Sequence, residues 1–343
     1  MIDRRNFGKM VGMGAVTAAM AQTATGCATT VSDTMATPMA SEGATGFGPL
    51  KQVKAGVLNV GYVEAGPATG PAVLLLHGWP YDIHSFVKVT PMLAAKGYRV
   101  IVPYLRGYGT TRFLSSSTPR SGEQAVFGTD VVTLMDALKI KKAVLAGFDW
   151  GGRAADIVAV LHPERVTGLV SVGGYLIVNR KNAQQPIAPK TEQAWWYQYY
   201  FATDRGQRGL ERYRHDLTKL VWKTNSPTWH FDDATFDRSA AAFDNPDFVP
   251  VTIDNYRWRL GLAKSDPRYD DVEARLARES PISLPTIALD GALDPFTPPG
   301  NGSSYRAKFK GKYEHRTLHN IGHNVPQEAP DAFTQAVVDV TRL

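Results

Sequence analysis

The sequence predicts an α/β protein built on a mostly parallel, doubly wound sheet. Helical patterns separate four short apolar runs that suit buried strands, at residues 72–76, 98–103, 142–147 and 165–172. This alternation is typical of a parallel sheet with helices on both faces. With 343 residues, 43% hydrophobic and 20% charged, the chain is long enough to bury a large core.

Further elements extend the pattern toward both ends of the chain. An alternating stretch at residues 57–64 predicts a half-buried strand before the four runs, and residues 284–289 and 314–318 predict two strands after them. The helices predicted for the core are residues 85–96, 122–138, 153–162 and 329–342.

The alternation is interrupted once, after the sixth strand. Residues 179–280 are rich in Trp, Tyr, Arg and Asp and predict several short helices instead of sheet units. An insertion at this point would lie over the carboxyl ends of the strands, where ligands bind in open α/β sheets. We therefore expect a helical lid at residues 179–280 on a core of residues 47–178 and 281–343.

Residues 1–27 predict export of the protein. The stretch DRRNFGK at residues 3–9 precedes an uncharged run at residues 10–21, and together they resemble a twin-arginine signal peptide. The resemblance implies transport by the twin-arginine translocon to the periplasm or another exported location. Residues 28–46, rich in Ser, Thr, Ala, Gly and Pro, predict a flexible linker.

Cys27 is the single cysteine, which excludes an internal disulfide and a thiolate zinc site. The stretch Thr-Gly-Cys at residues 25–27 resembles a loose lipobox, in which a lipid on Cys27 would tether the protein to a membrane. Two alternatives stay open, namely cleavage at residues 19–21 and an unmodified Cys27 in the linker.

The charge pattern does not predict nucleic-acid binding. The 38 Lys and Arg against 32 Asp and Glu give a net charge of +6, and the sequence contains no block of five or more like charges. No nucleotide or metal motif occurs in the sequence, so we expect no cofactor. The sequence predicts no particular oligomeric state.

The motif GFDWGG at residues 147–152 follows a predicted strand and precedes a predicted helix. Glycines two positions before and two after Asp149 permit a sharp turn that presents this side chain at the helix N-terminus. The motif resembles the nucleophile elbow of the α/β-hydrolase fold, with a carboxylate where serine is common. HGWP at residues 77–80, Asp294 and His323 each follow a strand in the order of that fold, which implies Asp294 as the acid and His323 as the base.

The other aspartate and histidines that lie near these motifs are expected to have structural roles and not to serve as the acid or the base. Asp290 precedes a glycine and is expected to be a turn residue, unlike Asp294. His315 and His319 lie on or beside the last predicted strand, and His77 is expected to shape the loop beside the nucleophile.

A carboxylate nucleophile limits the reactions that the protein could catalyse. Attack of Asp149 on a carbonyl carbon would form an anhydride, whereas attack on a saturated carbon forms an ordinary ester. We expect an Asp149 ester that is hydrolysed by a water deprotonated by His323, while Asp294 orients the imidazole. The backbone N–H groups of Trp79 and Trp150 are expected to form the oxyanion hole.

Two families use an aspartate nucleophile with this histidine and acid, and they differ in how they stabilise the leaving group. Epoxide hydrolases place two lid tyrosines over the nucleophile, and the stretches YQYYF at residues 197–201 and NYR at residues 255–257 resemble theirs, which implies Tyr197 and Tyr256 as proton donors. The resemblance implies an epoxide hydrolase that converts a small apolar or aromatic epoxide to a vicinal diol. The expected substrate-binding residues in its largely apolar pocket are Trp79, Trp150, Trp195 and Trp196.

Two alternatives stay open. Haloalkane (or haloacid) dehalogenases use the same triad and hold halide with Trp or Asn N–H groups, for which the chain offers Trp150 and the lid tryptophans. A hydrolase fold without catalysis that serves binding is the second alternative. Arg153, alone at the start of a helix, is expected to make a structural salt bridge.

Overall fold

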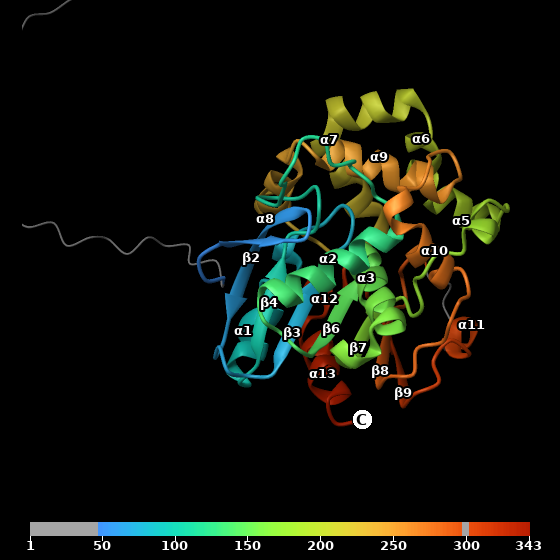
Figure 1. Cartoon of the computed structure of the whole chain (residues 1–343). Coiled ribbons are helices and arrows are strands. Elements are labelled where there is room, and N and C mark those ends of the chain that lie inside the picture. Colours follow the sequence, from blue (N-terminus) through green and yellow to red (C-terminus); the bar gives the residue numbers. More distant parts are fainter. Residues whose placement is uncertain (1–46, 297–301) are drawn as a thin grey trace, which may run out of the picture. The chain divides into compact units, whose positions relative to one another are not determined.

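A nine-stranded sheet lies at the centre of the residues that the computed structural model describes, 47–296 and 302–343 (Figure 1). The strands are β1 (Lys51–Ala55), β2 (Leu58–Ala65), β3 (Ala72–Leu76), β4 (Arg99–Pro103), β5 (Arg112–Phe113), β6 (Ala143–Phe148), β7 (Val166–Val172), β8 (Thr286–Gly291) and β9 (Tyr313–Leu318). They follow the order β1-β2-β4-β3-β6-β7-β8-β9, with β5 paired to β2. Every pairing from β4 to β9 along this order is parallel, whereas β1, β2 and β5 join antiparallel. The predicted mostly parallel, doubly wound sheet is therefore confirmed.

The central strands are buried on both faces, as a parallel sheet covered by helices requires. Every residue of β6 and β8 is buried; β6 is apolar throughout, whereas β8 also buries Thr286 and Asp290. The core helices are α1 (Val89–Ala95), α2 (Gln124–Ala137), α3 (Asp149–Leu161), α11 (Ser303–Arg306), α12 (Val325–Glu328) and α13 (Pro330–Val340). Helix α2 packs against α3, and α1 packs against α13.

Two strands at the margin of the sheet were not predicted. Strand β1, KQVKA, is mostly exposed at the edge, so its sequence lacks the apolar run of a buried strand. Strand β5 has only two residues. When β5 is left out of the count, β7 is the sixth strand, so the insertion begins where it was expected, although the sequence identified only five of the six strands before it.

The insertion between β7 and β8 is helical. Its helices are α4 (Arg180–Ala183), α5 (Pro189–Ala194), α6 (Trp196–Phe201), α7 (Asp204–Asn225), α8 (Asp233–Ala240), α9 (Phe248–Arg259) and α10 (Asp270–Leu276). Figure 1 shows α6, α7 and α9 stacked beyond one end of the sheet strands. We call the segment from α4 to α10 the lid.

The predicted export signal at residues 1–27, with Cys27, and the predicted linker at residues 28–46 lie outside the described residues. None of the helices in the described ranges is both long and apolar enough to span a membrane.

Candidate active site

The turn between β6 and α3 presents Asp149. This residue begins α3 with a φ of 52°, in the left-handed region that non-glycine residues seldom adopt. A Cβ on Gly147 would come within 2.7 Å of the Gly151 backbone, and a Cβ on Gly151 would come within 2.1 Å of the Leu76 carbonyl oxygen. Both glycines are therefore needed for β3, β6 and α3 to approach this closely, and the turn holds Asp149 at the helix N-terminus.

The loop after β3 packs directly on this carboxylate. The backbone N–H of Trp79 donates to Asp149 Oδ1 at 2.7 Å. Its neighbour His77 accepts a hydrogen bond from the Leu105 N–H at Nε2 (3.1 Å), so Nδ1 carries the proton and donates to the Gly78 carbonyl at 3.0 Å. Burial lowers the pKa of His77 to about 4, which keeps the ring neutral and fixes the loop.

His323 lies between two carboxylates. Its Nδ1 is 2.8 Å from Asp294 Oδ2, while its Nε2 is 3.8 Å from Asp149 Oδ2 and has no hydrogen-bond partner among the described residues. Burial lowers the pKa of His323, but the charge and hydrogen bond of Asp294, together with the charges of Asp149 and Glu328, outweigh burial and raise the pKa to about 9. The structure thus brings together the three residues that the sequence proposed as a triad.

Glu328, which the sequence analysis missed, holds the loop that carries His323. Its carboxylate accepts hydrogen bonds from the backbone N–H groups of Gly322 (2.7 Å) and Asn324 (2.9 Å) and from the Ser226 hydroxyl (2.6 Å). The lid therefore contributes to the placement of the histidine, because Ser226 directly follows α7.

Tyr197 of α6 and Tyr256 of α9 both line the cavity that holds Asp149. Their rings meet edge to face with centroids 5.6 Å apart, and both pack on the indole of Trp79. Burial, reinforced for both by the nearby charge of Asp149, raises the pKa of each phenol. Both hydroxyls consequently stay protonated at neutral pH and can donate a proton or a hydrogen bond.

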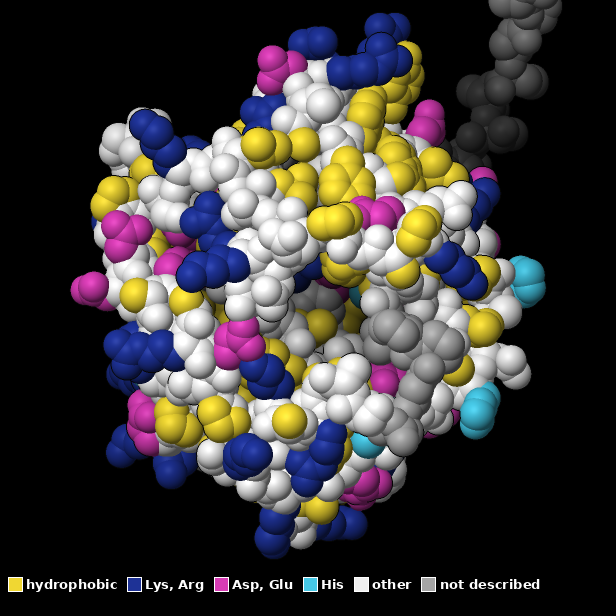
Figure 2. Space-filling view, turned by 90° about the vertical axis from the view of Figure 1, so that its right-hand side faces the viewer, with side chains coloured by type: hydrophobic (Ala, Val, Ile, Leu, Met, Phe, Trp, Pro, Cys, Tyr) yellow, Lys and Arg dark blue, Asp and Glu magenta, His cyan; other side chains and the backbone are white. Residues whose placement is uncertain are grey.

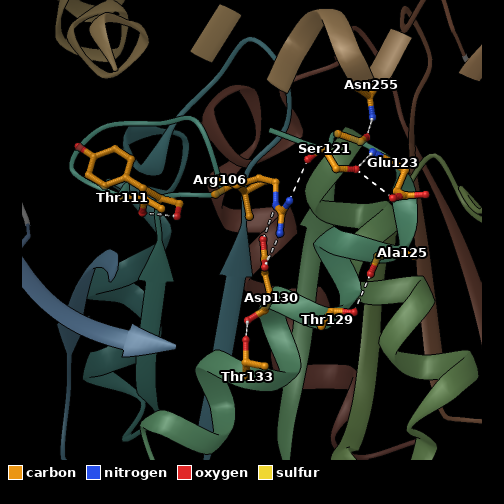
Figure 3. A network of polar contacts seen from close by, with 12 residues as sticks. Arg106, Thr111, Ser121, Glu123, Ala125, Thr129, Asp130, Thr133 and Asn255 are labelled. Atoms are coloured by element: carbon orange, nitrogen blue, oxygen red, sulfur yellow. Dashed lines mark hydrogen bonds and ion pairs between the residues drawn. The ribbon is translucent and has the colours of Figure 1, made fainter. Parts of the chain in front are cut away.

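Two hydrogen bonds hold the segment of α9 that carries Tyr256 to the core, and Figure 3 shows the one that Asn255 donates. Asn255 Nδ2 donates to the Gly122 carbonyl at 2.5 Å, and the Gly122 N–H donates to Asp254 Oδ2 at 2.7 Å. A Cβ on Gly122 would lie 2.7 Å from the Asn255 nitrogen, so only glycine permits this contact. Arg106 supports the same segment, because it donates to the Ser121 carbonyl at 2.8 Å. We call this set of contacts the α9 clamp.

The cavity has a volume of about 470 Å³. Beside the acidic and aromatic groups already named, its lining includes Arg153, Arg259, Glu279 and Lys308. Figure 2 shows a hollow at the centre of the face to which α5, α10 and α11 contribute, with basic and apolar side chains around it. Most of the lining is apolar or aromatic, as the sequence led us to expect, but charged side chains that the sequence analysis did not place there also enter it from α3, α9 and the segments next to α10 and α11.

The four predicted substrate-binding tryptophans separate into two groups. Trp150 and Trp195 line the cavity, whereas Trp79 and Trp196 do not. Trp79 is covered by Tyr197 and Tyr256, so it supports the tyrosines from behind.

Two further expectations are corrected by the structure. Asp290 is no turn residue, because it lies within β8 and accepts hydrogen bonds from the Tyr305 hydroxyl (2.6 Å) and His315 Nε2 (2.8 Å). Arg153 makes no salt bridge among the described residues, and its Nε donates to the Leu176 carbonyl at 3.0 Å.

These features agree with the family to which the chain belongs. Residues 71–330 match the alpha/beta hydrolase fold family, and the chain is a member of it. A crystal structure from Klebsiella pneumoniae subsp. pneumoniae, provisionally named an epoxide hydrolase, is 58% identical, with a TM-score of 0.85 and a match that covers 88% of this chain and 100% of that one.

Named epoxide hydrolases also match in sequence. Bifunctional epoxide hydrolase 2 from Sus scrofa is 34% identical over 151 residues, which are 43% of this chain and 26% of the relative. Epoxide hydrolase B from Mycobacterium tuberculosis is 32% identical over 150 residues, which are 40% of this chain and 41% of the relative. The match spans less than half the length of these two curated relatives.

Proposed function

We propose that this hydrolase-fold enzyme opens an epoxide to a vicinal diol through a covalent ester on Asp149. The observation that carries the proposal is the shared cavity, in which two protonated phenols, Tyr197 and Tyr256, lie with Asp149 and His323. A carboxylate and a pair of neutral acids suit a substrate whose leaving oxygen stays attached to the product.

In the first step, an Asp149 oxygen attacks one oxirane carbon and the C–O bond breaks. The alkoxide formed takes a proton from Tyr197 or Tyr256, which leaves a β-hydroxy ester and a phenolate. The proton stays available until this moment, because burial and the Asp149 charge raise the pKa of both phenols. The Asp149 charge disappears as the ester forms, which makes the phenolate less unfavourable.

In the second step, His323 removes a proton from a water that attacks the ester carbonyl. Alkylation of Asp149 also removes one of the charges that raise the pKa of His323, so the imidazole loses its proton more readily in the intermediate. The Trp79 N–H, already 2.7 Å from Asp149 Oδ1, would stabilise the oxyanion together with the Trp150 N–H. Collapse of this intermediate breaks the bond between the carbonyl carbon and the alkyl oxygen, and protonated His323 gives its proton to the departing alkoxide. The Asp149 carboxyl then loses its proton to the phenolate, which restores the starting state.

The dehalogenase alternative is weakened by where the indole N–H groups point. Trp79 Nε1 donates to Thr252 at 3.1 Å, and Trp222 Nε1 donates to the Pro80 carbonyl at 2.6 Å. Neither N–H is available for halide. Trp150 remains in the cavity, so a halide site is the second candidate.

The decisive experiment is trapping of the ester. A His323→Gln variant incubated with an epoxide should gain the mass of one epoxide on the peptide that contains Asp149, and Asp149→Ala should gain none. The proposal is refuted if no adduct forms while wild type releases halide from haloalkanes without forming diol. A purely binding protein would show neither reaction, and Asp149→Ala would leave its binding intact.

We also propose that residues 1–27 direct export through the twin-arginine translocon. The support is the sequence pattern alone, with Arg4 and Arg5 before an uncharged run. Replacement of both arginines by lysine should retain the protein in the cytoplasm in a fractionation experiment. A lipid on Cys27 predicts that Cys27→Ser moves the protein from the membrane fraction to the soluble one.

A further inference from the structure

Two arginines in the cavity have no part in the proposed reaction. Arg153 follows Asp149 by one turn of α3, and Arg259 follows Tyr256 by three residues on α9. Residues three or four apart share a helix face, so each arginine faces the cavity together with a group of the proposed mechanism. A core helix and a lid helix thus each carry an arginine about one helical turn, roughly 5 Å along the helix axis, beyond a residue of the proposed mechanism.

Both guanidinium groups keep donors free. Arg153 is fixed by its Nε, which donates to the Leu176 carbonyl, so its two terminal nitrogens remain available. Arg259 stacks on the ring of Trp195 at 4.6 Å, which occupies the face of the guanidinium and leaves the N–H groups at its edge. Neither arginine has a carboxylate partner among the described residues.

The other charged groups of the cavity offset this pair only in part, because the charge of Asp149 favours the ionised form of Arg259 but does not outweigh burial and Arg153. Glu279 is paired with Lys308, and Asp294 with His323. Burial, together with the charge of Arg153, lowers the pKa of Arg259 to about 10. Two buried cations that line one cavity without an ion-pair partner are unfavourable unless an anion enters between them.

We propose that Arg153 and Arg259 form a carboxylate subsite, so that the preferred substrates are short epoxides that carry a carboxylate. This inference rests on the proposed epoxide hydrolysis and names its substrate class. The planar guanidinium fork suits a carboxylate, which can accept two N–H donors from each arginine. The arginines also offset the repulsion between a substrate carboxylate and Asp149, which would otherwise keep such a substrate out.

The test compares glycidate with glycidamide, which share the oxirane and differ in a carboxylate against a neutral amide. Wild type should hydrolyse glycidate with a kcat/KM about tenfold or more above that for glycidamide, as expected for charge-assisted hydrogen bonds. Arg259→Met keeps an apolar stem against Trp195 and should remove most of this preference by raising KM for glycidate alone. Arg153→Met should act in the same direction.

Arg257→Met is the matched control, because Arg257 lies on the same helix but donates to Phe201 and Asp204 and does not line the cavity. It should keep the preference for glycidate. Equal kcat/KM for the two substrates in wild type would overturn the subsite while leaving epoxide hydrolysis intact. An equal fall of kcat for both substrates in Arg259→Met would also overturn it, because the arginine would then act on the tyrosine hydroxyls.

A binding experiment separates this inference from the proposed function. If neither oxirane yields diol, the proposed function fails, and the subsite is decided by thermal unfolding with propionate or propionamide. Stabilisation of wild type by propionate alone, absent in Arg259→Met, supports the subsite. Equal effects of the two ligands, or none, refute it.

Discussion

The α9 clamp predicts that a residue without a direct role in the chemistry controls the rate. In Asn255→Ala the Gly122 carbonyl loses a donor at 2.5 Å, at a site where Asn255 is only 1% exposed. A buried polar group that loses its partner costs about 1–3 kcal/mol, so the free energy of unfolding should fall by that amount. The adjacent Tyr256 should shift with the released backbone, and a displacement of about 1 Å can lower a rate about 100-fold.

The assay is a single-turnover measurement of ester formation, beside urea unfolding of the same variant. Asn245→Ala is the matched control, because Asn245 is also a buried lid asparagine and donates to the carbonyls of Thr111 (2.7 Å) and Gly109 (3.2 Å). It should lose similar stability but keep the rate of ester formation. If Asn255→Ala loses stability without any loss of rate, the clamp supports only the fold and the reasoning about Tyr256 is wrong.

Three further predictions concern the nucleophile and its neighbours. Tyr197→Phe and Tyr256→Phe should each slow ester formation by about tenfold or more in single-turnover kinetics, and an unchanged rate in both would remove the phenols from the mechanism. Because the pKa of His323 in the folded protein, about 9, exceeds the ordinary histidine pKa of about 6.5, the ionised ring stabilises the fold fully below about pH 6.5. The stability gap between wild type and His323→Gln should therefore shrink as pH rises from 6.5 to 9 in urea titrations, and a gap that grows would contradict the assigned charge. Gly151→Ala should cost more than about 3 kcal/mol, since its Cβ would meet a strand carbonyl oxygen at 2.1 Å. Gly152→Ala should cost less in the same measurement, because the one atom within 3 Å of its Cβ, at 2.8 Å, belongs to the flexible side chain of Leu176.

The sequence was most informative where a short local pattern carries a geometric requirement. The glycines around Asp149 predict a sharp turn, and the structure shows why any larger residue would collide there. Asp294 and His323 could be found from order alone, because the carboxyl ends of neighbouring parallel strands meet at one edge of the sheet.

Features that depend on distant partners could not be predicted in this way. Asp290 resembled a turn residue because its hydrogen-bond partners, Tyr305 and His315, lie 15 and 25 residues further along the chain. The polarity of the cavity depends on how each lid helix is rotated about its axis, which packing decides. Residues Trp196 and Arg259 illustrate this, since the first lies outside the cavity lining and the second within it.

The lid leaves the sheet after β7 and returns at β8, and these two strands are hydrogen-bonded neighbours. Its two ends are therefore close in space, and the sheet is continuous without it. In evolution, exchange of this one contiguous gene segment would replace Tyr197, Tyr256 and Arg259 together while it preserved Asp149 and His323. The proposed proton donors and half of the proposed carboxylate subsite would then be inherited as a unit, so that leaving-group chemistry and substrate charge would diverge together among relatives.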